Sequence, residues 1–62
     1  MLGEKIKQLR LSRGMTIKDV TEKASITRSL LSQIENNKAN PSINSLMAIA
    51  QAIGVPIGSF FD

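Results

Sequence analysis

Apolar side chains recur along the chain at helical spacing, and the stretches that carry them are separated by glycine, serine, threonine and proline. The first apolar stripe is formed by Leu2, Ile6 and Leu9, which predict a helix over residues 2–12. Gly14 follows this stripe, and glycine readily adopts the left-handed backbone that ends many helices. We therefore expect one helix at the start of the sequence and a tight turn after it.

The second predicted helix begins at Thr16 and runs to about Ala24. Thr16 stands three residues before Asp19, and this spacing is typical of a capped helix start because the hydroxyl accepts an otherwise unpaired amide. The hydroxyl of Thr21 is expected to bond back to the carbonyl of Ile17. The predicted inner face of this helix consists of Ile17, Val20, Thr21 and Ala24.

Only residues 25–27 separate the second helix from the third. Thr27 is the expected cap of a helix over residues 28–36. A polar loop over residues 36–41 follows, in which Asn37 suits a left-handed backbone. The apolar side of the third helix consists of Leu30, Leu31 and Ile34.

Ser42 and Gly54 bound the fourth predicted helix, and Pro56 can open a short fifth one. We expect Phe60 to join the core, and the pattern leaves Phe61 open between core and surface. No stretch alternates as a strand does, so the predicted fold is all-α, a compact bundle of four to five helices in one domain over residues 1–62. The expected inner stripe of the fourth helix consists of Ile43, Leu46, Ile49, Ala50 and Ile53.

Two absences in the composition restrict the chemistry of the chain. It contains no cysteine and no histidine, which removes the thiolate and imidazole metal ligands and the commonest general base. The acidic residues do not cluster, so we expect no catalytic residue, no metal site and no cofactor, and we predict that the chain is not an enzyme. The aromatic content of 3% also argues against a stacking surface for single-stranded nucleic acid.

Positive charge is concentrated in the first two thirds of the chain. All eight Lys and Arg residues lie at or before Lys38, and Asp62 is the only charged residue after it. This distribution favours a polyanionic partner, although lysine and arginine also simply solvate helix faces. The sequence has neither a long apolar run nor a secretory signal pattern, so we expect a cytoplasmic protein that does not enter membranes.

The third predicted helix carries a polar strip of small, hydrogen-bonding side chains opposite its apolar side. An α-helix fits the major groove of DNA, where such side chains can pair with base edges. Serine and asparagine are weak helix formers, so their presence on this strip favours a functional role over that of an ordinary surface helix. The short turn before the helix indicates a helix-turn-helix, in which the second helix enters the groove. The strip consists of Arg28, Ser29, Ser32, Gln33 and Asn36.

Three features in order resemble the Xre, or Cro/C1-type, family of phage-repressor-like regulators. They are the Thr16-led helix, the Ser-Gln-Ile-Glu run at residues 32–35 and the Asn-Pro-Ser run at residues 40–42. The resemblance covers residues 2–62 and implies sequence-specific binding of double-stranded DNA by a transcriptional regulator. A protein-interaction module of the same fold, such as an antitoxin or a coactivator-like adaptor, is the alternative.

The resemblance also assigns roles to individual positions. It implies an ion pair between Arg10 and Glu35. Three positions depart from the common family pattern, namely Ile17, Thr21 and Ser25, and Ser25 requires either a strained backbone or a different turn. The implied base-reading residues are Arg28, Ser29, Ser32 and Gln33. The implied contacts with the DNA backbone are Thr16, Thr27, Asn36 and Lys38.

One module of this size buries about 600–1,000 Å² on DNA, which is usually too little for tight specific binding. We therefore expect a homodimer on an inverted-repeat operator, with two recognition helices about 34 Å apart. The apolar end of the chain offers a surface for dimerisation, or it completes the core. It can also lead into a further domain of a longer regulator. The candidate residues are Val55, Ile57, Phe60 and Phe61.

Overall fold

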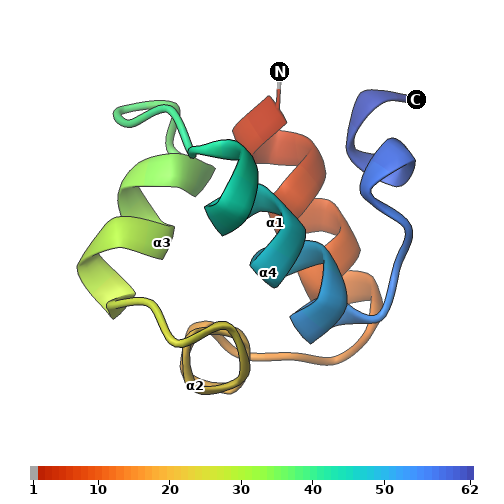
Figure 1. The fold of residues 1–62 in the computed structure, drawn as a ribbon. Helices are drawn as coiled ribbons and strands as arrows, with labels where there is room; N and C mark the ends of the chain where they lie inside the picture. The colour runs from red at the N-terminus through yellow and green to blue at the C-terminus, as the bar shows by residue number, and fades with distance from the viewer. Residues whose placement is uncertain (1) are drawn as a thin grey trace.

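The computed structural model describes residues 2–62 and contains four α-helices and a final 3₁₀-helix (Figure 1). No strand occurs within these residues, so the all-α prediction is confirmed. The helices are α1 (Leu2–Ser12), α2 (Ile17–Ala24), α3 (Arg28–Glu35), α4 (Ile43–Ile53) and η1 (Ile57–Phe61).

Short polar side chains fix where α2, α3 and α4 begin. Thr16 and Asp19 form a reciprocal capping box, because the amide of Asp19 donates to the Thr16 hydroxyl over 3.0 Å and the amide of Thr16 donates to the Asp19 carboxylate over 2.9 Å. Thr27 caps α3 and Ser42 caps α4 in the simpler way, each by accepting one amide. The predicted helix starts are thereby confirmed.

Left-handed backbone ends the helices where the sequence predicts it. Gly14 and Gly54 have φ angles of 67° and 87°. Asn37 has φ 59° after α3, as expected. Ser25, which follows α2, has φ 58° and ψ 42°, so the strained alternative of the two considered for this residue is correct.

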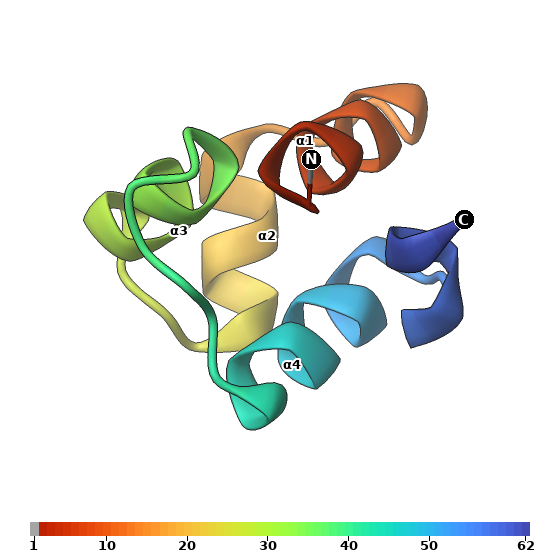
Figure 2. The ribbon, with the colours of Figure 1, turned by 90° about the horizontal axis from the view of Figure 1, so that it is seen from above.

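The core is formed by the apolar sides of all four α-helices, and α3 contributes through its contacts with α1 and α2. α2 packs chiefly against α4, α1 packs against α3, and η1 contacts both α1 and α4 (Figures 1 and 2). Phe60 is 3% exposed and belongs to this core, as predicted. The fully buried side chains with the largest volumes are Ile6, Leu31, Ile34, Ile49 and Val20.

Three details of the prediction are wrong. Ile43 is 65% exposed, because it occupies the first position of α4, and burial along that helix begins a turn later at Leu46. The hydroxyl of Thr21 donates to the carbonyl of Lys18, not to that of Ile17, since a threonine in a helix can reach either of the two preceding-turn carbonyls. α3 ends at Glu35, one residue earlier than expected, and Asn36 leaves the helical conformation with φ −95° and ψ 10°.

None of the helices found in residues 2–62 is long and apolar enough to cross a membrane.

Candidate nucleic-acid interface

α3 presents one polar face to solvent. Arg28, Ser29, Ser32 and Gln33, the four residues expected to read bases, are all exposed. On the opposite side Leu31 and Ile34 are 0% and 1% exposed, so packing fixes the rotation of the helix about its axis. α3 lies at the margin of the molecule in both Figure 1 and Figure 2. The polar strip is therefore an outward-facing ridge on a firmly packed helix.

The turn between α2 and α3 is tight and regular. The amides of Ser25 and Ile26 both donate to the carbonyl of Thr21, the latter over 3.2 Å, and so close the end of α2. Ile26 is partly buried against the core, and Thr27 then starts α3 by accepting the amide of Leu30 over 3.0 Å. The chain thus changes direction within residues 25–27, which produces the helix-turn-helix that the sequence predicts.

Thr16 and Thr27 lie exposed at the starts of α2 and α3. The hydroxyl of each accepts a backbone amide, so the side chains serve as caps in the free protein. The remaining free amides of a helix's first turn and its dipole favour an anion such as a phosphate. Thr16 also affects Asp19, because the hydrogen bond that the amide of Thr16 donates to the carboxylate holds the pKa of that group below its ordinary value of 3.8.

A buried ion pair joins α1 to the end of α3. Nε and Nη2 of Arg10 donate to the two carboxylate oxygens of Glu35 over 2.8 and 3.0 Å, and Nη1 of Arg10 donates to the carbonyl of Met15 over 2.9 Å. The two side chains are only 7% and 3% exposed. The pair implied by the family resemblance is therefore present. It neutralises the only acidic residue of α3 and keeps that carboxylate away from the polar ridge.

The loop after α3 contains the remaining expected backbone contacts. The side-chain amide of Asn36 donates to the carbonyl of Ser32 over 2.8 Å, so in this structure it lies against the end of α3. Lys38 is exposed, and its backbone amide donates to the carbonyl of Gln33 over 2.8 Å. The lysine side chain is thus on the surface next to the C-terminal end of the ridge.

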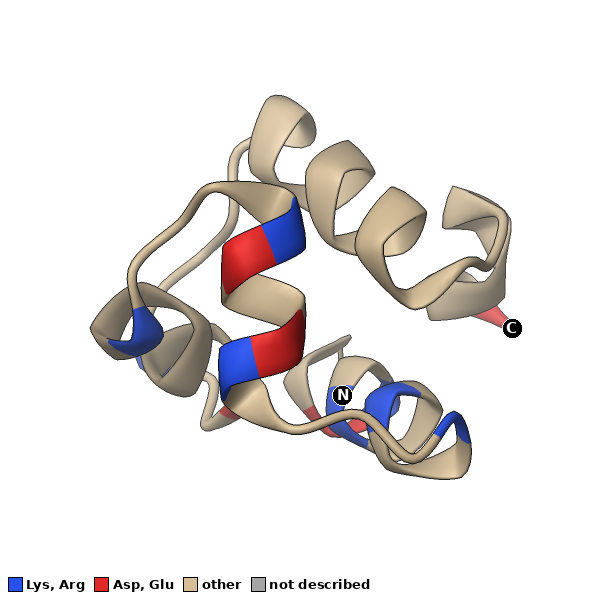
Figure 3. Ribbon diagram, turned by 90° about the horizontal axis from the view of Figure 1, so that it is seen from below, with Lys and Arg blue, Asp and Glu red and all other residues tan. Residues whose placement is uncertain are grey.

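Basic residues lie on the half of the fold that contains the helix-turn-helix. Lysine and arginine occur on α1, α2 and α3, whereas α4 carries no charged residue (Figure 3). Arg28 is the basic residue of α3, at its first position. Four of the five acidic residues lie on the same three helices, but the basic residues of these helices outnumber them by six to four. The net positive charge therefore favours an anionic ligand at the α1–α3 side, and α4 adds nothing to it.

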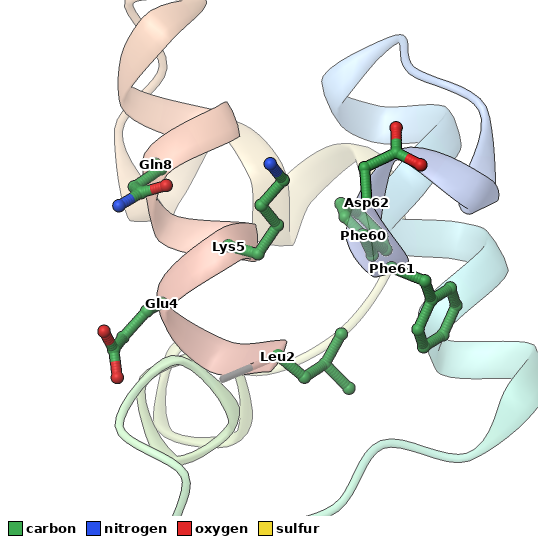
Figure 4. Close-up of a pocket in the computed structure, with 7 residues that line it drawn as sticks. All are labelled: Leu2, Glu4, Lys5, Gln8, Phe60, Phe61 and Asp62. Atoms are coloured by element: carbon green, nitrogen blue, oxygen red, sulfur yellow. The ribbon is translucent and has the colours of Figure 1, made fainter.

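Two hollows lie on the surface of the described residues. The larger one, of about 330 Å³, lies between the first two turns of α1 and η1, with side chains of α1 on one wall and of η1 on the other (Figure 4). Its titratable residues are Glu4, Lys5 and Asp62. Within residues 2–62 no group of three or more acidic, histidine or cysteine side chains could hold a metal ion.

Two features of the site escaped the sequence-based prediction. Gly3 is buried against the end of α3, and the side chain of Asn37 accepts the amide of Gly3 over 3.1 Å. No local pattern indicates a contact between residues 34 positions apart. The second feature is exposed apolar surface on α4, where Ile43 and Met47 are 65% and 49% exposed.

The fold and this arrangement of α2 and α3 define a helix-turn-helix DNA-binding domain. Residues 6–60 match the helix-turn-helix family model, and the chain belongs to that family, in its Cro/C1-type branch. It is 38% identical over 58 residues to the immunity repressor protein of Bacillus phage phi105, covering 94% of this chain and 40% of the repressor. It is 36% identical over 63 residues to the transcriptional regulator SinR of Bacillus subtilis, covering all of this chain and 57% of SinR.

Solved structures give the same result. A crystal structure of SinR, a master regulator for biofilm formation, in complex with DNA superposes with a TM-score of 0.92 at 36% identity and full coverage of both chains. The restriction-modification controller protein C.AhdI of Aeromonas hydrophila has a TM-score of 0.94 over 97% of this chain and 91% of its own, and at 20% identity this likeness concerns the fold alone. The chain spans about half or less of the length of the curated relatives it matches.

Proposed function

We propose that residues 1–62 form the DNA-binding domain of a transcriptional regulator that recognises a specific operator with α3. One observation carries the proposal, namely the exposed polar ridge of α3 directly after a tight turn from α2. The ridge is narrow, because Ser29 and Ser32 are small, and it carries a single charge, at Arg28. Such a surface can enter the major groove and reach base edges without repelling phosphates.

The four residues of the ridge that are proposed to read bases have different roles. Arg28 can donate two hydrogen bonds to a guanine, and Gln33 can both donate to and accept from an adenine. Ser29 and Ser32 reach bases of either type and allow the helix to approach the groove floor. Arg28 and Gln33 therefore determine most of the discrimination between bases.

Four further residues contact the phosphate backbone in the proposed complex. Thr16 and Thr27 lie at the starts of α2 and α3, where the helix ends attract phosphates. Asn36 and Lys38 lie in the loop at the other end of α3. Phosphate contacts at both ends of a recognition helix fix its register in the groove but carry no sequence information.

We further propose that two copies bind an inverted-repeat operator together. Ile43 and Met47, one turn apart on uncharged α4, expose apolar surface beside a hollow of about 230 Å³ lined in part by Val55 and Ile57. A second copy can cover this surface without bringing like charges together, since the basic residues lie elsewhere. Phe60 takes no part in such contacts because it is buried.

Selection of bound sites from a random duplex pool tests the proposal. We expect one sequence family to be enriched, and an inverted repeat within it if two copies bind together. On the selected site, Gln33→Ala should cost about 1–3 kcal/mol of binding free energy and relax the preference for one base pair. Gln8→Ala, which removes an exposed glutamine from α1, is the matched control and should leave the preference unchanged.

Two outcomes would contradict the proposal in different ways. A uniform loss of affinity on every duplex for Gln33→Ala would remove its base-reading role. Enrichment of no sequence, together with tight capture of a protein partner, would instead favour the interaction-module alternative, for which the exposed Ile43 and Met47 are a suitable surface.

A further inference from the structure

A hydrogen bond joins the loop after α3 to the first turn of α1, although the two residues are 34 positions apart in the sequence. The amide of Gly3 donates to Oδ1 of Asn37 over 3.1 Å. The first amides of any helix lack partners within that helix, so a side-chain oxygen placed there acts as a cap. Asn37 is thus a cap supplied by tertiary structure, from the far end of the recognition helix.

The close approach of α1 and α3 at this point depends on glycine. A Cβ atom on Gly3 would lie 2.3 Å from the carbonyl oxygen of Ile34 and 2.6 Å from that of Glu35. Any other residue would therefore separate the two helices. The contact also brings the positive end of the α1 dipole against the negative end of the α3 dipole, which is favourable.

Asn37 shapes the loop through its backbone as well. Its left-handed φ of 59° turns the chain so that the amides of Lys38 and Ala39 both reach the carbonyl of Gln33, over 2.8 and 3.2 Å. Asn37 and Lys38 are both exposed, and the side chain of Asn37 points back to α1, where it accepts the amide of Gly3. The position of Lys38 is therefore set by a residue that is itself anchored to a different helix.

We propose that Asn37 is a positioning residue for DNA binding, which orients Lys38 toward the phosphate backbone by anchoring the loop to Gly3 of α1. The inference rests on the proposed function, in which Lys38 contacts phosphate. The loop is held to α3 by the carbonyl of Gln33 and to α1 by the amide of Gly3, so it loses little conformational entropy when Lys38 binds a phosphate. A loop without the second attachment would have to be ordered on binding, and its affinity for DNA would be lower.

Asn37→Gly isolates the anchor from the turn. Glycine accepts the left-handed backbone without strain, so the loop can keep its path while the acceptor for the Gly3 amide is lost. Asn37→Asp is the conservative variant, because a carboxylate oxygen can accept the same hydrogen bond. Asn40→Gly is the matched control, since Asn40 is an exposed asparagine of the same loop.

The test is a double-mutant cycle between Asn37→Gly and Lys38→Ala, measured by fluorescence anisotropy on a short labelled duplex of arbitrary sequence at fixed low salt. We expect Asn37→Gly to weaken binding about fivefold in the parent chain but less than about twofold in the Lys38→Ala background. Equal losses in both backgrounds would overturn the inference and show that Asn37 acts on DNA independently. If the parent chain binds neither this duplex nor any sequence selected from the random pool, the proposed function itself fails.

Amide hydrogen exchange of the free protein gives a second measurement that does not need DNA. The Lys38 amide should exchange about fivefold faster in Asn37→Gly, and at about the parent rate in Asn37→Asp and Asn40→Gly. Equally fast exchange in Asn37→Asp and Asn37→Gly would overturn the anchoring role, as would an unchanged rate in Asn37→Gly. This measurement also decides the question if the glycine variant is too unstable for titration.

Discussion

Removing the carboxylate of Glu35 should destabilise the domain more than any change on the polar ridge of α3. Glu35 accepts two of the three hydrogen bonds that the guanidinium of Arg10 donates within the protein. In Glu35→Ala the guanidinium would keep only the carbonyl of Met15, at a position where the side chain is 7% exposed. A buried cation without its partner is costly because water cannot replace the lost carboxylate.

The size of the effect follows from the burial of the pair. Breaking a buried ion pair by removing one partner costs about 3–5 kcal/mol. Stabilities of about 0.05–0.15 kcal/mol per residue correspond to roughly 3–9 kcal/mol for a chain of this length. Glu35→Ala should therefore remove at least a third of the stability and, at the lower end of that range, leave the domain unfolded at 25 °C.

Urea denaturation followed by far-ultraviolet circular dichroism measures this loss. Glu22→Ala, which removes an exposed carboxylate from α2, is the control and should change the free energy of unfolding by less than about 0.5 kcal/mol. The double variant Arg10→Met/Glu35→Leu replaces both charges with apolar side chains and should regain all but about 1–2 kcal/mol of the parent stability.

The double variant provides the refuting result. If it is no more stable than Glu35→Ala, then the unpaired buried charge is not the cause of the loss, and the explanation given above is wrong. A loss below about 1 kcal/mol for Glu35→Ala would show that the pair behaves as an exposed one.

Three further results are expected. Lys38→Ala should weaken binding to every duplex and reduce the slope of log affinity against log salt by about one, measured by titration at several salt concentrations; an unchanged slope would exclude a phosphate contact. Ser25→Gly should raise the free energy of unfolding by about 0.5–1 kcal/mol by removing the cost of its left-handed backbone, and a decrease would show that φ is not strained there. Asp19 has its pKa lowered on folding by the Thr16 amide, so its contribution is present above about pH 3.8 and lost as the pH falls through the lower, folded-state value. Asp19→Asn should therefore flatten the acid limb of a stability–pH curve, and an unchanged acid limb would contradict the capping-box assignment.

The helix boundaries could be predicted because their signals are local. Thr16, Thr27 and Ser42 each precede their helix by one residue and accept an amide three residues on, so the sequence and the hydrogen bond span the same few residues. The left-handed conformation of Gly54 is local for the same reason. The polar ridge on α3 could also be predicted from the sequence, since helical periodicity separates the polar and apolar sides of the helix.

Contacts between helices could not be predicted in this way. Gly3 has no side chain and therefore adds nothing to a hydrophobic pattern. Its role depends on where the carbonyls of Ile34 and Glu35 lie in the folded chain. Ile43 fits the apolar stripe of α4 by spacing, yet it is exposed because the first turn of that helix extends past the elements that cover the rest. Periodicity states which side of a helix is apolar but not how far along the helix its neighbours reach.

The recognition helix separates the residues that hold it from the residues that face outward. A helix of eight residues is too short to be stable alone, so α3 depends on its cap and its buried side. Its stabilising groups are Thr27, Leu31, Ile34 and Glu35, whereas the four exposed ridge residues make no contact that the core requires. Because exposed substitutions change stability little, the ridge can vary without loss of the fold. In this chain the ridge can therefore change while the Arg10–Glu35 ion pair and the Gly3–Asn37 contact keep α3 in place.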